Sequence, residues 1–163
     1  ATALYWAVAR GHIDIALLLI ERGANVSITT AERDGPLLAA TRHNHTDIAL
    51  ALLQAGARLN SVDRFGDTPL LNAIARGNRA VVRALLRAGA NPNRAHDDDG
   101  RTPLLAAVEG GHRRSVKLLL NAGADPNRAD EEGQTALDVA RRGGQGEIVQ
   151  LLEERVGGEA TGP

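Results

Sequence analysis

The chain has 163 residues, of which 43% are hydrophobic but only 2% aromatic, and its formal net charge is −1. A near-neutral chain has no overall field that would attract nucleic acid or an anionic membrane, so we predict neither partner. The absence of Cys excludes disulfides and thiolate sites, and no apolar run approaches the roughly 20 residues that span a bilayer.

Composition leaves the compartment open, because a chain without Cys fits reducing and oxidising surroundings equally. We favour the cytoplasm and keep the periplasm and secretion as alternatives. Arg outnumbers Lys by 18 to 1 in a chain rich in Ala and Gly, which is typical of GC-rich bacterial genes.

The first helix of each unit is predicted where Leu is followed three residues later by Ala, as at Leu4 and Ala7 or Leu70 and Ala73. Thr68 and Thr102 precede Pro, which suits a capping residue and the first helical turn. Residues that tolerate a left-handed backbone should end these helices, namely Gly11, Asn44, Gly77, Gly111 and Gly144.

A second helix is predicted after each of these stops, because apolar residues recur there at helical spacing. They are Ile15, Leu18 and Leu19, then Ile48, Leu52 and Leu53, Val81, Leu85 and Leu86, Val116, Leu119 and Leu120, and finally Ile148, Leu151 and Leu152. The dipeptide Gly-Ala closes the first four of these helices, at Gly23-Ala24, Gly56-Ala57, Gly89-Ala90 and Gly123-Ala124.

These dipeptides are 33, 33 and 34 residues apart, so the chain is predicted to stack one supersecondary unit. Between the units lie extended stretches and Gly-containing turns, such as Asn91-Pro92-Asn93 and Asp63-Arg64-Phe65-Gly66. We predict that β-hairpins connect the units. A stack of this kind offers an extended recognition surface rather than a catalytic cleft.

The pattern Asp-x-x-Gly-x-Thr-Pro-Leu, leading into Gly-His and ending in Leu-Leu-x-x-Gly-Ala-Asp, resembles the ankyrin repeat over about 155 residues. The resemblance implies an all-α fold, an alpha solenoid of helix-turn-helix units joined by β-hairpin loops. We expect one domain over residues 1–156, with units at 1–27, 28–60, 61–93, 94–127 and 128–156, and a disordered tail over 157–163.

Several departures from the family pattern produce local expectations. Gly35 replaces the capping Thr and Arg33 the turn Gly of the second unit, so the hairpin from Ser27 to Asp34 should be irregular. The fourth unit has one extra residue within 94–100, which should lengthen its hairpin. The fifth unit ends in Glu153-Glu154-Arg155, like a polar cap, whereas the first is an ordinary internal unit. We therefore expect more repeats or another domain before residue 1.

Partners of ankyrin proteins usually meet the hairpin tips and the exposed side of the first helices, the concave face. Carried over by position, this resemblance implies a protein partner that contacts Arg10, Arg42, Arg64, Phe65, Asp67, Arg76, Asp98, Asp99, Arg101, Glu109, Glu131, Glu132 and Gln134.

Phe65, the only Phe, is the strongest contact candidate because an aromatic residue on a turn is hard to bury. It could instead fold against a neighbouring hairpin. Five carboxylates, of Asp97 to Asp99 with Glu131 and Glu132, should gather on one flank, either for a basic partner or cation or as a solvated edge.

Two further surfaces are predicted on the convex side. Leu17 and Leu50 replace charged residues there and should leave an apolar patch that binds a partner or is covered by a neighbouring domain. Arginines at 79, 83 and 87, with 113, 114 and Lys117, should form a basic stripe that serves solubility. Without interleaved aromatic residues, this stripe does not predict nucleic-acid binding.

No catalytic, cofactor or metal site is predicted. His12, His45 and His112 fill the Gly-His position of the repeat and so have a structural cause, and no nucleophile elbow, Walker loop or zinc helix occurs. The leading hypothesis is a non-catalytic protein-binding module. The alternatives are a targeting or substrate-recognition array of an enzyme or toxin whose catalytic domain lies before residue 1, and a structural spacer.

Overall fold

The computed structural model describes residues 1–158, which form ten helices arranged as five helix pairs. The first helices of the pairs are α1 (Ala3–Ala9), α3 (Pro36–Arg42), α5 (Pro69–Ala75), α7 (Pro103–Glu109) and α9 (Ala136–Arg142). The second helices are α2 (Ile13–Glu21), α4 (Thr46–Gln54), α6 (Arg79–Arg87), α8 (Arg113–Asn121) and α10 (Gly146–Gly158). The prediction of an all-helical solenoid is confirmed.

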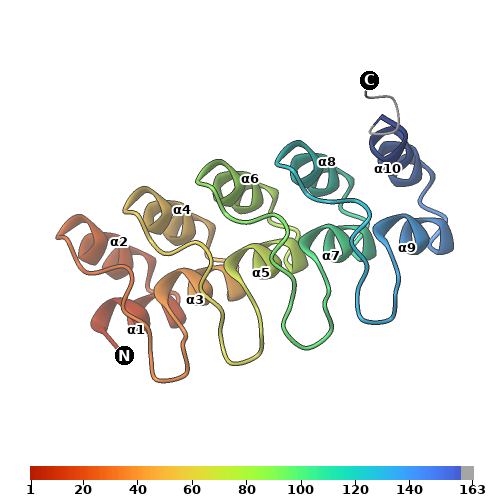
Figure 1. Ribbon diagram of the computed structural model, residues 1–163. Helices are drawn as coiled ribbons and strands as arrows, with labels where there is room; N and C mark the ends of the chain where they lie inside the picture. Colours follow the sequence, from red (N-terminus) through yellow and green to blue (C-terminus); the bar gives the residue numbers. More distant parts are fainter. Residues whose placement is uncertain (159–163) are drawn as a thin grey trace.

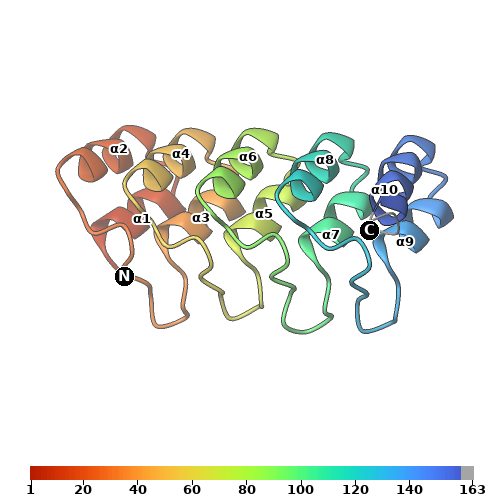
Figure 2. The same cartoon turned by 45° about the horizontal axis from the view of Figure 1, so that its top comes forward.

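The first helices form one row and the second helices form another, and the loops between successive pairs project on the side away from the second row (Figure 1, Figure 2). We name these loops by the repeat into which they lead: connector 2 is residues 22–35, connector 3 is 55–68, connector 4 is 88–102 and connector 5 is 122–135. The surface formed by the connectors and the exposed side of the first helices is called the connector face.

The first helices begin where the sequence supplies a cap. The Thr68 and Thr102 hydroxyls accept hydrogen bonds from the backbone N–H groups of Leu71 at 3.1 Å and Leu105 at 3.2 Å, and Pro follows each Thr in the first turn. Such caps satisfy amides that a helix leaves free at its start. At Gly35 the cap has no side-chain hydrogen bond, as the missing Thr predicts.

The core consists of small and branched side chains shared between neighbouring repeats. The recurring Ala of the first helices is buried in every repeat, and so are the principal leucines of the later second helices, Leu52, Leu85, Leu119 and Leu152, each 0% exposed. The main contacts of a first helix are with its own partner helix and the first helices on either side. The core is therefore continuous along the stack but only one repeat thick.

The connectors are tight turns rather than β-hairpins, since residues 1–158 contain no strand. Each turn is closed by a backbone hydrogen bond, for example from Asp63 N to Asp67 O at 3.2 Å and from Asp130 N to Gln134 O at 3.1 Å. Connectors 2, 3 and 5 add a second bond inside the turn, such as Gly66 N to Asp63 O at 3.3 Å, and these short-range bonds do not form a ladder of paired strands. The prediction of β-hairpin connectors was wrong on this point.

Connector 2 is also more regular than predicted. Thr30 N donates to Asp34 O at 2.8 Å, which is the closing bond of the other connectors, and Arg33 adopts the left-handed conformation (φ 64°) that Gly66 and Gly133 adopt in their turns. Arg can take this conformation at a cost in free energy, so the turn keeps its shape without Gly.

The extra residue of connector 4 lies inside its turn, as expected. The closing hydrogen bond runs from His96 N to Arg101 O at 2.9 Å and spans five residues, whereas the other three connectors close over four. The stacked helices on either side keep the same length. The insertion is therefore absorbed by the connector alone.

The two ends of the stack differ. At the N-terminal end Trp6, Ile15 and Leu18 are 52%, 53% and 47% exposed, whereas Ile48 and Val81, which correspond to Ile15, are covered by the preceding repeat. At the other end α10 has 13 residues, and the exposed Glu153, Glu154 and Arg155 make this end polar, as predicted. The helix includes Gly157 and Gly158, so the predicted tail was wrong there, and residues 159–163 lie outside the described part.

The left-handed turn residues provide a stability test. Arg33→Gly should stabilise the fold by about 0.5–1 kcal/mol, because relief of backbone strain exceeds the extra freedom that Gly gains in the unfolded chain. Gly133→Ala should destabilise it by about 1 kcal/mol, since the position has φ 76° and no atom within 4 Å of an added Cβ, which leaves strain as the only cost. Urea unfolding measures both changes. Equal midpoints for the two variants would contradict this account of the turns.

Candidate functional site

One groove on the connector face brings together seven of the thirteen predicted contact residues. It has a volume of about 300 Å³ and lies between connectors 4 and 5 and the ends of their first helices. Its predicted lining residues are Asp98, Asp99, Arg101, Glu109, Glu131, Glu132 and Gln134. Asp130 and Arg142 also line the groove, and neither is among the thirteen predicted contact residues.

The groove is acidic because most of its charges have the same sign. Six carboxylates line it against two guanidinium groups, which leaves a net charge of −4. Arg101 Nη1 already pairs with Glu109 Oε2 at 3.2 Å, and Arg142 bonds Gln134. Connectors 4 and 5 also touch directly, since Glu131 N donates to Asp99 O at 3.1 Å.

The predicted cluster of five carboxylates is only partly assembled. Asp98, Asp99, Glu131 and Glu132 meet in the groove, whereas Asp97 pairs with Arg94 Nη2 at 2.7 Å on connector 4 itself. Residues 1–158 bring no three His, Asp or Glu side chains into an arrangement suited to a metal ion.

Phe65 is exposed at the tip of connector 3, with 55% of its surface accessible. It does not fold against a neighbouring connector. The Arg64 guanidinium lies over its ring at 4.6 Å from the centroid, and Arg64 Nη1 also reaches Glu32 Oε1 of connector 2 at 3.2 Å. An exposed aromatic ring held by a cation presents a fixed apolar surface.

Arg42, one of the predicted contact residues, is held in the scaffold by two ion pairs. Its Nη1 donates to Asp34 Oδ2 at 2.5 Å and its Nη2 to Asp63 Oδ2 at 2.6 Å, and both aspartates are almost fully buried. Burial alone would lower the pKa of Arg42, but the hydrogen bonds and charges of Asp34 and Asp63 outweigh burial and raise it. The guanidinium thus ties connector 2 to connector 3.

Tyr5 extends this network into the first repeat. Its hydroxyl donates to Asp34 Oδ2 at 3.0 Å. Burial raises the pKa of Tyr5, and the hydrogen bond and charge of Asp34 raise it further. A chain of polar contacts therefore runs from Tyr5 through Asp34 and Arg42 to Asp63, across three repeats.

Asp67 lies two residues after Phe65 and is half-buried, and its side chain forms no ion pair or hydrogen bond with the described residues. Burial raises its pKa, and the charge of Asp63 raises it further, against opposing effects of His96, Arg101 and Arg42. Of the remaining predicted residues, Arg76 is exposed at the end of α5, and Arg10 lies over the Trp6 ring at 5.6 Å on the first repeat.

The convex side differs from its prediction in one respect. Leu17 and Leu50 are half-buried because neighbouring second helices pack side by side, so they do not form the exposed patch that we expected. The exposed apolar residues of α2 are instead Ile13, Ile15 and Leu18. The predicted basic stripe on α6 and α8 is exposed along its whole length.

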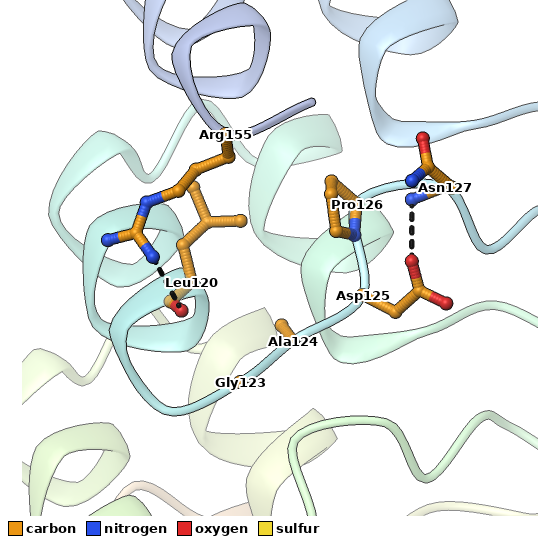
Figure 3. A pocket seen from close by; sticks show the side chains of 7 residues that line it. All are labelled: Leu120, Gly123, Ala124, Asp125, Pro126, Asn127 and Arg155. Carbon is orange, nitrogen blue, oxygen red and sulfur yellow. Dashed lines mark hydrogen bonds between the residues drawn. The ribbon is translucent and has the colours of Figure 1, made fainter. Parts of the chain in front are cut away.

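A larger cavity of about 490 Å³ lies apart from the connector groove, between the end of α8, residues 123–127 and α10 (Figure 3). Arg155 spans it, with its Nη1 donating to Leu120 O at 3.4 Å and its Nη2 to Asn121 Oδ1. None of the predicted contact residues lines this cavity. No helix among residues 1–158 has the length and apolar character needed to cross a membrane.

The network at Arg42 predicts a large loss of stability. Arg42→Met should destabilise the protein by about 2–3 kcal/mol, because two buried carboxylates lose their partner; this value is reduced because the Arg42 side chain is 28% exposed. Arg76→Met is the matched control, since Arg76 is exposed and has no ion pair within residues 1–158. Urea unfolding should separate the two variants clearly. Equal stabilities would mean that Arg42 is not structural.

Asp67 predicts a dependence of stability on pH. Its folded pKa lies above the ordinary value of 3.8, so the protonated carboxyl favours folding below that value and this contribution is lost as pH rises through the folded pKa. Asp67→Asn, which stays neutral, should therefore gain stability relative to the natural chain between pH 3 and pH 7. Asp98→Asn, at an exposed position, should not. Unfolding free energies across this range test the sign.

The family comparison agrees with the repeating geometry. The model described as ankyrin repeats (3 copies) matches three overlapping stretches of the chain, residues 4–96, 37–130 and 90–160, which together cover nearly its whole length. No curated protein was found to match. Five stacked helix pairs, each with a first helix of seven residues, carry the sequence features that this family model recognises. The chain belongs to the ankyrin repeat family.

Proposed function

We propose that the chain binds a partner protein through its connector face and performs no chemistry there. Ankyrin repeats are in general protein–protein interaction modules and are typically non-catalytic. The observation that carries the proposal for this face is the exposure of Phe65 on connector 3, where Arg64 lies over its ring, and Arg76 is exposed at the end of α5 in the same repeat. Exposed aromatic and Arg side chains are the types that contribute most to binding energy at interfaces.

The acidic groove extends this surface toward the C-terminal repeats. Phe65 and Arg64 lie on connector 3, and the groove follows on connectors 4 and 5, so a partner can span three successive repeats. A net charge of −4 in the groove favours partner segments with Lys or Arg at that end, because complementary charge speeds encounter and rejects acidic competitors.

The proposal is tested by comparing two triple variants. Arg64→Ala, Phe65→Ala and Arg76→Ala together remove the exposed contacts of repeat 3, whereas Arg79→Ala, Arg83→Ala and Arg87→Ala remove three exposed arginines from α6 on the other side of that repeat. For a partner purified from the native source, we expect affinity to fall by about tenfold or more in the first variant. It should stay within about twofold in the second.

Calorimetric titration supplies the affinities, and urea unfolding confirms that both variants are folded. Unchanged affinity in the connector-face variant, with a loss in the α6 variant, would move the binding surface to the second helices and refute the proposal.

A second candidate function is that of a targeting or substrate-recognition array within a larger enzyme or toxin. The observation that favours it is the apolar surface of α1 and α2, where Trp6, Ile15 and Leu18 are about half exposed. The position of Ile15 is buried in every other repeat and the positions of Trp6 and Leu18 are buried or half-buried there, so this surface suits a further repeat or an adjoining domain. The full-length gene sequence decides: an upstream catalytic domain supports this candidate, and upstream 33-residue repeats alone refute it.

A further inference from the structure

Repeats 2, 4 and 5 share one side-chain pairing on the connector face, and repeat 3 lacks it. The residue just before the capping position pairs with the last residue of the first helix, eight positions later. Asp34 pairs with Arg42 at 2.5 Å, Arg101 pairs with Glu109 at 3.2 Å, and Gln134 accepts from Arg142. The first position is acidic in repeat 2, basic in repeat 4 and neutral in repeat 5, but in all three repeats the two side chains bond each other.

In repeat 3 the pairing is incomplete. Asp67 occupies the first position, but the last residue of α5 is Ala75, which has nothing to offer a carboxylate. Every other cation close enough to affect Asp67 is engaged elsewhere: Arg42 with Asp34 and Asp63, His96 with Asp99 at 3.1 Å, and Arg101 with Glu109.

The unpaired carboxylate lies in a place where a partner can reach it. Asp67 is half-buried and lies two residues from the exposed ring of Phe65, in the middle of the five repeats. A carboxylate that has lost part of its hydration gains more from an approaching cation than a fully solvated one does. Ala75 is exposed and stands at the end of α5, the position that Arg42 has at the end of α3.

We infer that the position between Asp67 and Ala75 receives a basic side chain of the partner protein, an Arg before a Lys. The partner's guanidinium replaces the cation that repeat 3 lacks and pairs with Asp67 as Arg42 pairs with Asp34. Arg is preferred because its planar fork bonds a carboxylate through two N–H groups. This inference rests on the proposed function and adds the chemistry of the central contact.

Filling the position from within the chain tests the inference without a known partner. Ala75→Arg places a guanidinium where Arg42 lies in repeat 2, and it should lower the pKa of the Asp67 carboxyl, which NMR titration measures. Ala9→Arg is the matched control, because α1 ends at the corresponding position but Ala1, not Asp, stands eight residues before it. A pKa of Asp67 below its ordinary 3.8 in the natural chain would overturn the inference, since it would show that Asp67 already has a partner.

Binding is tested with peptides selected from a random phage-displayed library on the immobilised chain. Peptides that need Arg64, Phe65 and Arg76 should share an Arg or Lys, and they should lose about tenfold or more in affinity on Asp67→Asn and on Ala75→Arg. Ala9→Arg should leave their affinity unchanged. Fluorescence anisotropy with the synthetic peptides gives the values.

The outcomes separate the inference from the proposed function. If peptides that need Phe65 bind Asp67→Asn as well as they bind the natural chain, the Asp67 contact is wrong and the connector-face function stands. If selection yields only peptides that ignore the Arg64, Phe65 and Arg76 substitutions, the function and the inference both fail.

Discussion

Contact between neighbouring first helices, through Ala side chains too small to hold them apart, is the constraint on which this molecule depends. Ala40, Ala73, Ala107 and Ala140 are all but completely buried, and no repeat has a core of its own. Each repeat is therefore stable only because of the next one. Because the helices must meet in one way, the connectors emerge at regular intervals along one side, and side chains far apart in the chain become neighbours there.

Polar contacts on the connector face follow the same spacing. Arg42 reaches Asp63, 21 residues ahead, because stacking places connector 3 beside α3. The same logic applied to repeat 3 leaves Asp67 opposite Ala75. One guanidinium thus belongs to the scaffold, while the equivalent place one repeat further is free for another molecule. Asp34 and Asp67 therefore differ in role although they are the same residue type at the same repeat position.

The helices could be predicted from sequence because their signals are local: Leu and Ala at helical spacing, Thr before Pro, and Gly at the stops. The pairing of Arg42 could not, since neither aspartate is marked in the sequence as buried and one belongs to the next repeat. The connector strands were predicted wrongly because extended composition does not reveal that the closing backbone hydrogen bonds of each connector stay within its turn. The exposure of Ile15 could not be predicted for another reason. The sequence around Ile15 has the same pattern as that around Ile48, and only Ile48 has a preceding repeat packed against it. For the candidate site, the sequence predicted the face and Phe65 as contacts, and the stacking of repeats brings seven of the predicted residues into one groove.

Connector 4 shows that the stack accommodates a change of loop length on this face. Its additional residue is confined between His96 and Arg101, and the helices before and after it have the lengths found in repeats 2 and 3. The helix pairs therefore keep their form when this connector is one residue longer. For protein engineering, the stretch from Asp97 to Gly100 is a natural graft point: a foreign peptide inserted there would be displayed beside an acidic groove on a rigid support.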